Sequence, residues 1–382
     1  MFGIVDCNTM YSSVETIFRP DLRGRGVAVC SNNDGCIVTL NAEAKAAGLE
    51  KFKPYFQVKD FCKKNDITIM SSNYALYADI SNKVMSIIES EVPEMQQYSI
   101  DESFFLFRNM NEIDYRVFGH KLKNRLHREV RMPVCVGFGT SKTLAKLANH
   151  IAKKNPISKG VCCLDEQDQI DRWLARIEVN NVWGVGQQTT LKLNSIGIET
   201  ALQLSKADPL MIKNEFSIVL ERTVRELRGE SCLSLHEPVV QQQQIIVSRS
   251  FGQKVGVITE VRSAIATHIV RAMERLRNKN LHVKGFQIFA HARGSYDTSS
   301  ISKYVKLPTY TQDTSEVLKL ATKALESIFV NGPRYSKAGV MLLDLVDSEN
   351  LQLDLLNLST SPKNQKLNKL LDKLNEFDKV VT

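Results

Sequence analysis

The sequence of 382 residues lacks the features of a membrane or exported protein. No apolar run approaches the ~18 residues that a membrane-spanning helix needs. The first residues, M-F-G-I-V-D-C-N, have neither the basic segment nor the small-residue cleavage site of a signal peptide. We therefore expect a cytoplasmic protein with no membrane partner. No internal repeat is present either, which excludes repeat architectures.

The cysteines lack the spacing of a metal site or of a redox motif. The eight residues form no C-x-x-C pair and no His/Cys set with zinc spacing. They are Cys7, Cys30, Cys36, Cys62, Cys135, Cys162, Cys163 and Cys232. Most stand inside apolar stretches, so we expect reduced, small core residues rather than disulfides.

Acidic residues are scarce in two long segments. Residues 120–160 contain ten Lys or Arg against one acid, Glu129, and residues 241–347 contain fifteen against eight. Residues 165–240 are instead acidic, with eight basic residues against twelve. Together with the net charge of +8, this pattern favours a polyanionic partner held at two places. Solvated helix faces are the alternative explanation.

The length and the apolar content of 43% predict two or three globular domains. Strands and helices alternate in the first 164 residues, which predicts an α+β domain with a mixed or antiparallel sheet. Residues 166–229 have an all-helical pattern, and residues 241–347 return to strand–helix–strand. The segment 233–244, with Pro238 and four successive glutamines, marks a boundary. Residues 348–382 are polar and predict a loosely ordered tail.

Several elements can be placed from periodicity and caps. The run 2–8 predicts a strand ending at Asp6, followed by a helix with Met10, Val14 and Phe18 on one face. Asn41 is the expected N-cap of a short helix that stops at Gly48. Further elements are expected as helices over 74–89, 114–128, 142–154, 258–277 and 314–329, and as a strand over 98–107.

Three carboxylates form the candidate catalytic site. Asp6 ends the first strand, and Asp101 and Glu102 belong to another, within Y-S-I-D-E-S-F. If these strands are neighbours, the acids meet at one edge of the sheet, where only bound cations offset their repulsion and burial. Two Mg²⁺ ions suit such oxygen ligands and support in-line phosphoryl transfer. Surface or capping acids are the alternative.

The surroundings of these acids favour a nucleotide substrate. Tyr11 lies one helical turn after Asp6, and Lys45 lies on the short capped helix. Lys142, Lys146 and Lys153 share one face of the helix 142–154, opposite its apolar stripe, so they face a groove or solvent. Lysines near a metal cluster indicate a triphosphate, and plain solubility is the alternative.

A glycine pair indicates a phosphate-binding hairpin. The segment V-W-G-V-G at 182–186, followed by Q-Q-T-T-L-K-L, resembles a helix–hairpin–helix. Gly184 and Gly186 would let backbone N–H groups approach a DNA phosphate closely, which positions a duplex without reading its sequence.

At this point the sequence resembles the Y-family, or translesion, DNA polymerases, and among them the bacterial UmuC group, the catalytic subunit of DNA polymerase V. The resemblance covers roughly residues 1–358, in family order and spacing. The matching stretches are D-C-N-x-M-Y-x-S-x-E (6–15), F-R-P-D-L (18–22), S-N-N-D-G-C (31–36), N-A-E-A-K (41–45), S-S-N-Y-A-L-Y-A-D (71–79), Y-S-I-D-E (98–102), K-T-L-A-K-L-A-N-H (142–150), V-W-G-V-G (182–186), L-E-R-T-V-R-E-L-R-G-E (220–230), S-R-S-F-G (248–252) and R-Y-S-K-A-G-V-M-L (334–342).

The resemblance implies a multidomain α+β fold shaped like a right hand. The palm would comprise residues 1–18 and 76–164, and small fingers would comprise 19–75. A helical thumb with the helix–hairpin–helix would comprise 165–232, and an α+β little finger 241–347. A C-terminal tail, 348–382, would carry the clamp-binding motif.

The resemblance also implies roles for single residues. Asp6, Asp101 and Glu102 match the metal-binding carboxylates, and the backbone carbonyl of Cys7 matches a further ligand. Tyr11 matches the steric gate that rejects a ribose 2′-hydroxyl. The remaining matches are Thr39, Lys45 and Lys153 toward the incoming deoxynucleoside triphosphate, Arg249 toward the template backbone, and Gln352, Leu353, Asp354, Leu355 and Leu356 toward the sliding clamp.

The function that the resemblance implies is error-prone translesion synthesis in the SOS response to DNA damage, by two-metal nucleotidyl transfer without proofreading. Primer–template DNA, a sliding clamp, a UmuD′-like dimer and a RecA filament are the implied partners. This chain ends at Thr382, whereas UmuC proteins usually continue for several tens of residues. This departure from the family pattern bears on the implied contacts with UmuD′ and RecA, not on the catalytic core. Ala42 replaces the Tyr of many Y-family members, as in the UmuC group.

Two other functions compete with this one. A phosphatase of the haloacid dehalogenase type would need a second acid where Asn8 stands, so its general acid is missing. A truncated, catalytically inactive DNA-binding or regulatory homologue is the non-enzyme alternative, and the presence of all three acids opposes it.

Overall fold

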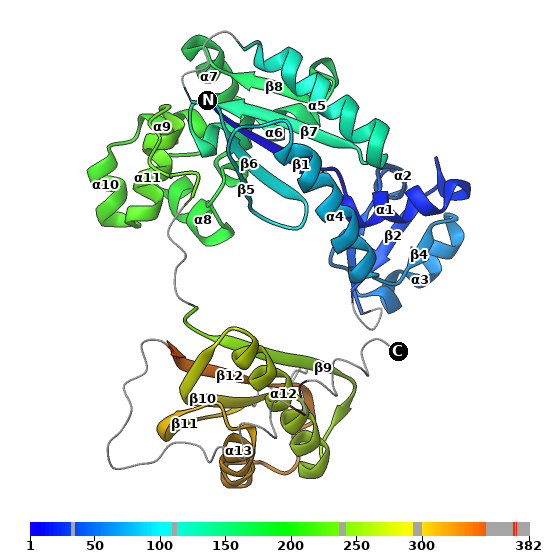
Figure 1. Ribbon diagram of the computed structural model, residues 1–382, viewed down its shortest axis with the longest axis vertical. Helices are drawn as coiled ribbons and strands as arrows, with labels where there is room; N and C mark the ends of the chain where they lie inside the picture. The colour runs from blue at the N-terminus through cyan, green and yellow to red at the C-terminus, as the bar shows by residue number, and fades with distance from the viewer. Residues whose placement is uncertain are drawn as a thin grey trace. The chain divides into compact units, whose positions relative to one another are not determined.

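The structure is a computed structural model that describes residues 1–31, 35–108, 113–236, 242–292 and 300–348, together with 370 and 372. The chain divides into two compact units, Met1–Pro238 and Val239–Thr382 (Figure 1). Among the described helices, none is long and apolar enough to cross a membrane.

A five-stranded mixed sheet forms the centre of the first unit. Its strands, in spatial order, are β5 (Met95–Gln97), β6 (Glu102–Leu106), β1 (Phe2–Cys7), β7 (Val134–Gly139) and β8 (Val161–Leu164). All neighbours are antiparallel except the parallel pair β7 and β8. Strand β1 is buried along its whole length, which explains its continuous apolar sequence.

Helices cover both faces of this sheet. Helices α1 (Met10–Phe18), α4 (Tyr74–Glu89) and α5 (Tyr115–Val130) share a core with Val5, Phe105 and Val136. Helix α6 (Lys142–Lys154) packs on the other face, against β1, β7 and β8. Because side chains alternate along a strand, Asp6 and Glu102 lie on the same face as Ile4 and Phe104, which is the α6 face.

Helix α6 lies unusually close to the sheet because β7 contains glycines at the contact. A Cβ atom on Gly137 would stand 2.3 Å from both the Ala145 carbonyl oxygen and the Asn149 backbone nitrogen. Gly139 meets the backbone of Leu144 and Ala145 in the same way. The absence of a side chain at these two positions therefore brings the lysines of α6 within reach of β1 and β6.

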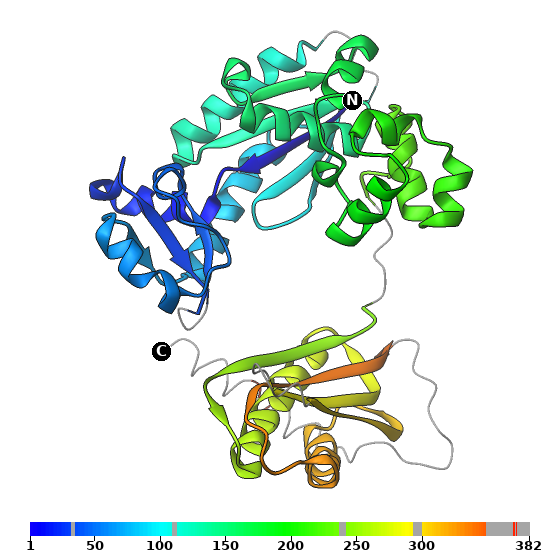
Figure 2. The ribbon, with the colours of Figure 1, turned by 180° about the vertical axis from the view of Figure 1, so that it is seen from behind.

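A smaller three-stranded sheet follows α1 along the chain. Its order is β3 (Ile37–Leu40), β2 (Val27–Cys30) and β4 (Thr68–Met70). The short 3₁₀ helix η1 (Pro20–Leu22) precedes it, and α2 (Ala42–Ala46) and α3 (Tyr55–Lys64) pack on it (Figure 2). Its small core contains Ala28, Ile37, Leu40 and Cys62.

The last part of the first unit is helical and shares its core with α6. The helices are α7 (Gln167–Leu174), α8 (Gln187–Ser195), α9 (Ala201–Lys206), α10 (Pro209–Glu215) and α11 (Ile218–Leu227), with the 3₁₀ turn η4 (Val179–Asn181) between α7 and α8. A fully buried carboxylate, Glu226, accepts the backbone N–H of Thr143 at 2.9 Å. This bond attaches α11 to the first turn of α6.

The second unit has its own sheet and its own core. Strands β9 (Ile245–Val255), β10 (Leu281–Ala292), β11 (Ser300–Thr311) and β12 (Tyr335–Asp347) pair antiparallel in the order β11-β10-β12-β9. Helices α12 (Ile258–Asn278) and α13 (Thr314–Ile328) pack against the sheet around Phe286, Ile288 and Val340.

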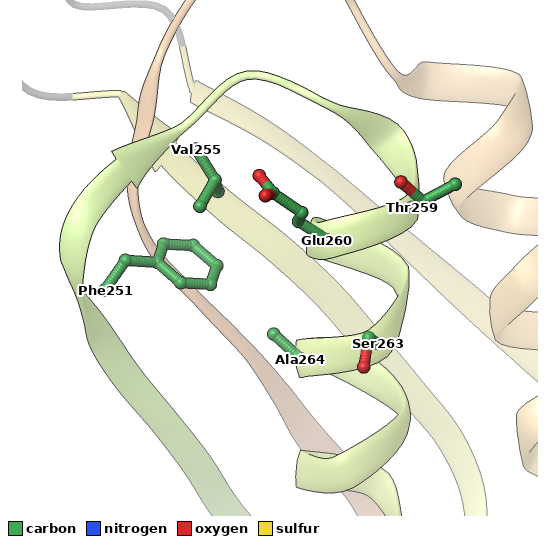
Figure 3. Close-up of a pocket in the computed structure, with 6 residues that line it drawn as sticks. All are labelled: Phe251, Val255, Thr259, Glu260, Ser263 and Ala264. Carbon is green, nitrogen blue, oxygen red and sulfur yellow. The ribbon is translucent and has the colours of Figure 1, made fainter.

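A hollow of about 530 Å³ opens between β9 and α12 (Figure 3). Phe251 and Val255 line it from the strand, and the helix contributes residues that include Glu260 and Ala264. The pairing register of β9 with β12 shifts between Ser250 and Val255, which bends this strand and opens the hollow. Its lining contains one carboxylate and no basic residue, so it is a poor site for phosphate chemistry.

Most elements agree with the sequence predictions. Asn41 caps α2 by accepting the Ala44 N–H, as predicted. The eight cysteines are free and six are buried, which confirms the prediction of core residues without disulfides. Two predictions were wrong. Phe18 is 55% exposed at the end of α1, and the strand predicted over 98–107 begins only at Glu102.

The later start of β6 has a local cause. The Ser99 hydroxyl accepts the backbone N–H groups of Asp101 and Glu102, which closes a turn just before the strand. Asp101 therefore stands in a turn rather than in the sheet. The predicted subdivision into palm, fingers, thumb and little finger stays a prediction, and most of the predicted tail lies outside the described residues.

Candidate active site

The three predicted acids belong to residues at the same end of β1. Asp6 and Glu102 are directly opposed across the β1–β6 pair. Asp101 immediately precedes β6, and its carbonyl oxygen accepts the backbone N–H of Cys7 at 2.9 Å. Residues almost a hundred positions apart in the chain are thus brought together by the register of one strand pair.

Asp101 is oriented by its own turn and lies near Tyr11. The Ser99 hydroxyl donates to the Asp101 carboxylate at 2.5 Å while it accepts the two N–H groups of the turn. Burial, the neighbouring Tyr74 and the charge of Asp101 together raise the pKa of Tyr11. The negative charge of Asp101 therefore disfavours ionisation of the Tyr11 hydroxyl.

Two lysines of α6 balance the other two acids. The Lys153 ammonium lies 2.6 Å from Asp6 Oδ2. The Lys146 ammonium donates to both oxygens of Glu102, at 2.9 Å and 3.0 Å. Asp6 and Glu102, the two acids on this face of the sheet, are thus each paired with a lysine of α6.

The ion pair with Lys153 does not fully offset the cost of burying the Asp6 carboxylate. The pKa of Asp6 is raised to about 7, mainly by burial; Lys153 lowers it and the neighbouring Glu102 raises it, so the three effects together leave it well above its ordinary value. Asp6 is almost inaccessible to water, so its charged form loses hydration. Crowded carboxylates of this kind are favourable sites for an additional cation.

The donor set fits a hard divalent ion, although the side chains are not gathered around one. Across the described residues, no three His, Cys, Asp or Glu side chains lie close enough together to hold a metal ion. In their place, Asp6 and Glu102 contact lysines and Asp101 contacts Ser99. Carboxylates with an adjacent backbone carbonyl, that of Cys7, are nevertheless the ligands that Mg²⁺ prefers.

Tyr11 is held by a second tyrosine. Its ring stacks on that of Tyr77, with 4.3 Å between centroids and 13° between planes. The buried Tyr77 hydroxyl donates to Glu15 at 2.6 Å, and Tyr74 meets Tyr11 edge-on. The Tyr11 ring therefore has a fixed position against Tyr77 and Tyr74.

The predicted triphosphate residues are only partly brought together. Lys153 pairs with Asp6, as described above. Thr39 is buried on β3 and Lys45 is exposed on α2, both in the three-stranded sheet region. The structure describes no interaction between either of these two side chains and the carboxylates, so their role stays a prediction.

Lys142 corrects the prediction for the lysine face of α6. It was expected to face a groove or solvent, but it is 4% exposed. Its ammonium donates to Gln96 Oε1 and to the Leu235 carbonyl, and it lies 5.2 Å from the Phe104 ring centre. The first turn of α6 is covered by the chain that follows α11, so this lysine stabilises packing.

The hairpin glycines lie between η4 and α8, with Gly184 in the turn and Gly186 at the start of the helix. Gly184 has a φ of 86°, a conformation that favours glycine, and Gly186 is the N-cap of α8. Gly184 and Lys192 line a hollow of about 300 Å³. Trp183, immediately before Gly184, packs toward Phe104 and Lys146, which links the hairpin to the carboxylates.

Two further predictions fall elsewhere in the chain. Arg249 is exposed on β9 in the second unit, opposite Ala338, and its charge is among the causes that lower the pKa of His268 on α12. The predicted clamp-binding residues 352–356 lie outside the described residues.

A cavity of about 230 Å³ adjoins the carboxylates. It is lined by Asp6 and Glu102 from the sheet and by Lys146, Asn149 and Lys153 from α6, with Trp183 among the other residues at its edge. The side-chain oxygen Oδ1 of Asn149 has no hydrogen-bond partner in the protein, and this residue is buried, with 4% of its surface exposed. This cavity, rather than the larger hollow beside α12, has the polar groups that phosphate chemistry requires.

Sequence comparison places the chain in a family. The sequence model described as impB/mucB/samB family matches residues 5–150, and the one described as its C-terminal domain matches residues 242–355. The chain is 42% identical to Protein UmuC of Salmonella typhimurium over 99% of its own length and 91% of that protein. The chain belongs to the impB/mucB/samB family. It is also 41% identical to Protein MucB of Escherichia coli, with the same coverage, and 28% identical to DNA polymerase IV of Oceanobacillus iheyensis, over 97% of this chain and 87% of that protein.

Solved structures agree on the fold of this impB/mucB/samB member. A Y-family DNA polymerase chimera of Dbh and Dpo4 superposes with a TM-score of 0.71 at 19% identity, over 91% of this chain and all of that chain. An insertion ternary complex of Dbh DNA polymerase gives a TM-score of 0.55 at 18% identity, with the same coverage. The fold is therefore that of a multidomain α+β Y-family polymerase, as predicted.

Several residues at the site were missed from the sequence. Ser99, which orients Asp101, stands inside the quoted Y-S-I-D-E stretch but was not assigned a role. The ring of Tyr98 and that of Trp183, which flank Lys146, were not expected near the acids. Only the strand register and the approach of α6 bring these side chains together, and neither can be read from local periodicity.

Proposed function

We propose that this chain is an error-prone, template-directed DNA polymerase that performs translesion synthesis, with its catalytic centre at Asp6, Asp101 and Glu102. The observation that carries the assignment is the opposition of Asp6 and Glu102 at the end of β1, with Asp101 bonded through its carbonyl oxygen to the backbone of Cys7. The impB/mucB/samB membership supports the reaction class.

The residues of this chain would hold two Mg²⁺ ions through the three carboxylates and the Cys7 carbonyl. When bound, such ions stabilise charge on the attacking and leaving oxygens of nucleotidyl transfer. Ser99 keeps Asp101 in its orientation, and Lys146 and Lys153 hold Glu102 and Asp6. The protein therefore contributes mainly positioning and electrostatic stabilisation.

The nucleotide pocket would use Tyr11, Thr39, Lys45 and Lys153. The Tyr11 ring, fixed on Tyr77, would lie beneath the sugar and exclude a 2′-hydroxyl. Lys153 has a 37% exposed side chain, so its ammonium can donate to a phosphate oxygen as well as to Asp6. Thr39 and Lys45 would contact the triphosphate from the three-stranded sheet region.

Primer–template DNA would be held at two places. The hairpin glycines Gly184 and Gly186 would receive a backbone phosphate, and Arg249 would contact the template backbone from the second unit. A sliding clamp would bind residues 352–356. A UmuD′-like dimer and a RecA filament are further proposed partners, in keeping with a role in the SOS response.

The direct test is primer extension on an undamaged template and on one with an abasic site. We expect templated incorporation that tolerates the abasic site, with misincorporation far more frequent than by a replicative polymerase. Glu102→Gln is expected to reduce the rate by at least ~100-fold, since it removes a charged ligand. Lys154→Met, on the exposed side of α6, is the matched control.

The extension assay also decides between the competing functions. DNA binding without incorporation, even with a clamp, UmuD′-like protein and activated RecA added, would contradict the proposal and favour an inactive homologue. Hydrolysis of a small phosphomonoester in place of extension would indicate a phosphatase.

A further inference from the structure

Lys146 holds Glu102 from a position that is almost closed to water. Its side chain is 17% exposed and that of Glu102 is 18% exposed. One ammonium donates to both oxygens of the carboxylate, at 2.9 Å and 3.0 Å. This geometry fixes the rotation of the carboxylate, because a turn about its bond to the chain would break at least one of the two bonds.

The ammonium of Lys146 is itself held by aromatic rings. It lies 4.8 Å from the ring centre of Tyr98, 5.3 Å from that of Trp183 and 6.0 Å from that of Phe104. Tyr98 and Trp183 meet at 89°, and Phe104 contacts both. Ring faces attract a cation, so these three rings, which we call the aromatic cage, keep the ammonium on Glu102.

The aromatic cage joins distant parts of the first unit. Phe104 belongs to β6, two residues after Glu102, and Tyr98 stands in the turn region before that strand. Trp183 immediately precedes the hairpin glycine Gly184. A displacement of the hairpin would therefore reach the Glu102 carboxylate through Trp183 and Lys146.

We propose that Lys146, held by the aromatic cage, is a positioning residue that orients Glu102 and lowers the affinity of the carboxylate site for divalent cations in exchange for faster turnover. This inference rests on the proposed function, because it takes Glu102 as a ligand. Lys146 is a cation in contact with that ligand, so it repels an arriving cation. Lys146 also fixes the position of the two Glu102 carboxylate oxygens, so we expect nucleotide addition to depend on it. Binding and turnover must then respond to its removal in opposite directions.

The test uses Lys146→Met, which keeps the length of the side chain and removes its charge. Binding of Mn²⁺ is measured without turnover, from the electron paramagnetic resonance signal of the free ion, and kcat is measured by primer extension at saturating Mg²⁺. We expect the Mn²⁺ dissociation constant to fall about threefold to tenfold, in line with the loss of one nearby positive charge. We expect kcat to fall at least ~10-fold because Glu102 is no longer oriented.

Two matched variants separate charge from packing. Lys146→Arg restores a cation and is expected to bring the Mn²⁺ dissociation constant back near that of the wild type. Lys154→Met removes an exposed lysine of the same helix and should leave both quantities unchanged. Trp183→Ala opens the aromatic cage and should lower both the Mn²⁺ dissociation constant and kcat, by smaller factors than Lys146→Met. Trp183→Phe keeps a ring at this position and should stay close to the wild type in both quantities.

The outcomes are distinct. Mn²⁺ binding in Lys146→Met that is weaker or unchanged, or tighter binding with unchanged kcat, would overturn the inference. If that variant melts several degrees below the wild type, Lys146→Gln and Trp183→Ala decide by the same criteria. Failure of the proposed function would give a different result: Glu102→Gln would then bind Mn²⁺ with the same dissociation constant as the wild type.

Discussion

Asp6 illustrates how a residue proposed for catalysis can destabilise the protein that contains it. Its carboxyl group is buried on the α6 face of the sheet, and this burial raises its pKa to about 7 despite the contact with Lys153. In the unfolded chain the same group has its ordinary, lower pKa. Ionising Asp6 in the folded protein therefore costs free energy that the unfolded chain does not lose.

Asp6→Asn is expected to stabilise the metal-free protein above neutral pH. The folded pKa lies above the unfolded value, so the folded state keeps a proton that the unfolded chain releases between roughly pH 4 and 7, and the free energy of unfolding falls across this window. The substitution should remove this loss and raise stability by about 1–4 kcal/mol at pH 8, with little effect at pH 4.

Thermal unfolding in a chelator at both pH values measures this effect. Asp21→Asn is the control, since Asp21 lies on the surface and pairs with Arg19. Equal stability of Asp6→Asn and the wild type at pH 8 would contradict the account of Asp6.

Tyr11→Ala is expected to admit ribonucleotides. The Tyr11 ring is fixed by stacking on Tyr77, so its loss would open the space that the proposal gives to the sugar. Discrimination against ribonucleotides, as the ratio of kcat/KM values for matched nucleotides, should fall at least ~10-fold. Phe18→Ala, at the exposed end of the same helix, is the control. Unchanged discrimination would return Tyr11 to a packing role.

At the residue scale the sequence predicted that Asp6, Asp101 and Glu102 stand at one end of the sheet, and their catalytic role stays a prediction; it did not predict which groups neutralise them. Asp6, Asp101 and Glu102 stand out because acids are rare among apolar strand residues. Lys146 and Lys153 were expected near a triphosphate, yet they contact Glu102 and Asp6 directly. The cause is the close approach of α6, which depends on the tertiary packing of Gly137 and is invisible in local periodicity.

At the scale of elements, the contact between α6 and β7 controls the site. Helix α6 provides both lysines that pair with the acids, and its distance from the sheet is set by the two glycines of β7. Any increase in that distance would withdraw both ammonium groups from the carboxylates.

Gly137→Ala is therefore expected to reduce both stability and activity. The new methyl group would overlap the backbone of Ala145 and Asn149, which cannot rotate away as a side chain can. We expect a loss of about 1–3 kcal/mol in the free energy of unfolding, together with slower primer extension. Gly256→Ala, whose new methyl group would have neighbours no closer than 3.9 Å, is the control. A Gly137→Ala protein with unaltered extension would show that the helix position does not matter.

Element boundaries were predictable where a cap or a regular apolar stripe defined them. Helix α4 has the predicted bounds, and Asn41 caps α2 as expected. The start of β6 was missed because the Ser99 hydroxyl closes a turn inside an otherwise strand-like sequence. Phe18 was wrongly predicted because it is the last residue of α1, where the helix has left the core and the ring is exposed.

At the scale of the whole molecule, the two units have separate cores. Among the residues that the structure describes, the core of the second unit contains only those from Ile245 onward. The helical part after β8 instead shares its core with α6, so it is joined to the five-stranded sheet. The sequence predicted the boundary near Pro238 from its composition, but nothing local could show which helices share a core.

Calorimetry should therefore resolve two unfolding transitions. Phe286→Ala, in the core of the second unit, is expected to cost about 3–5 kcal/mol and to lower one transition only. Leu122→Ala, in the core of the first unit, should lower the other. A single transition that both substitutions shift equally would contradict the separation of the cores.

The central claim for the molecule is that Asp6, Asp101 and Glu102 act as one catalytic centre for nucleotide addition. The most direct test is the single-turnover rate of primer extension by Asp101→Asn, the acid that no lysine is seen to hold in the described structure. We predict a rate at least ~1000-fold below that of the wild type, with primer–template affinity unchanged. Extension by Asp101→Asn within a few-fold of the wild-type rate would contradict the account.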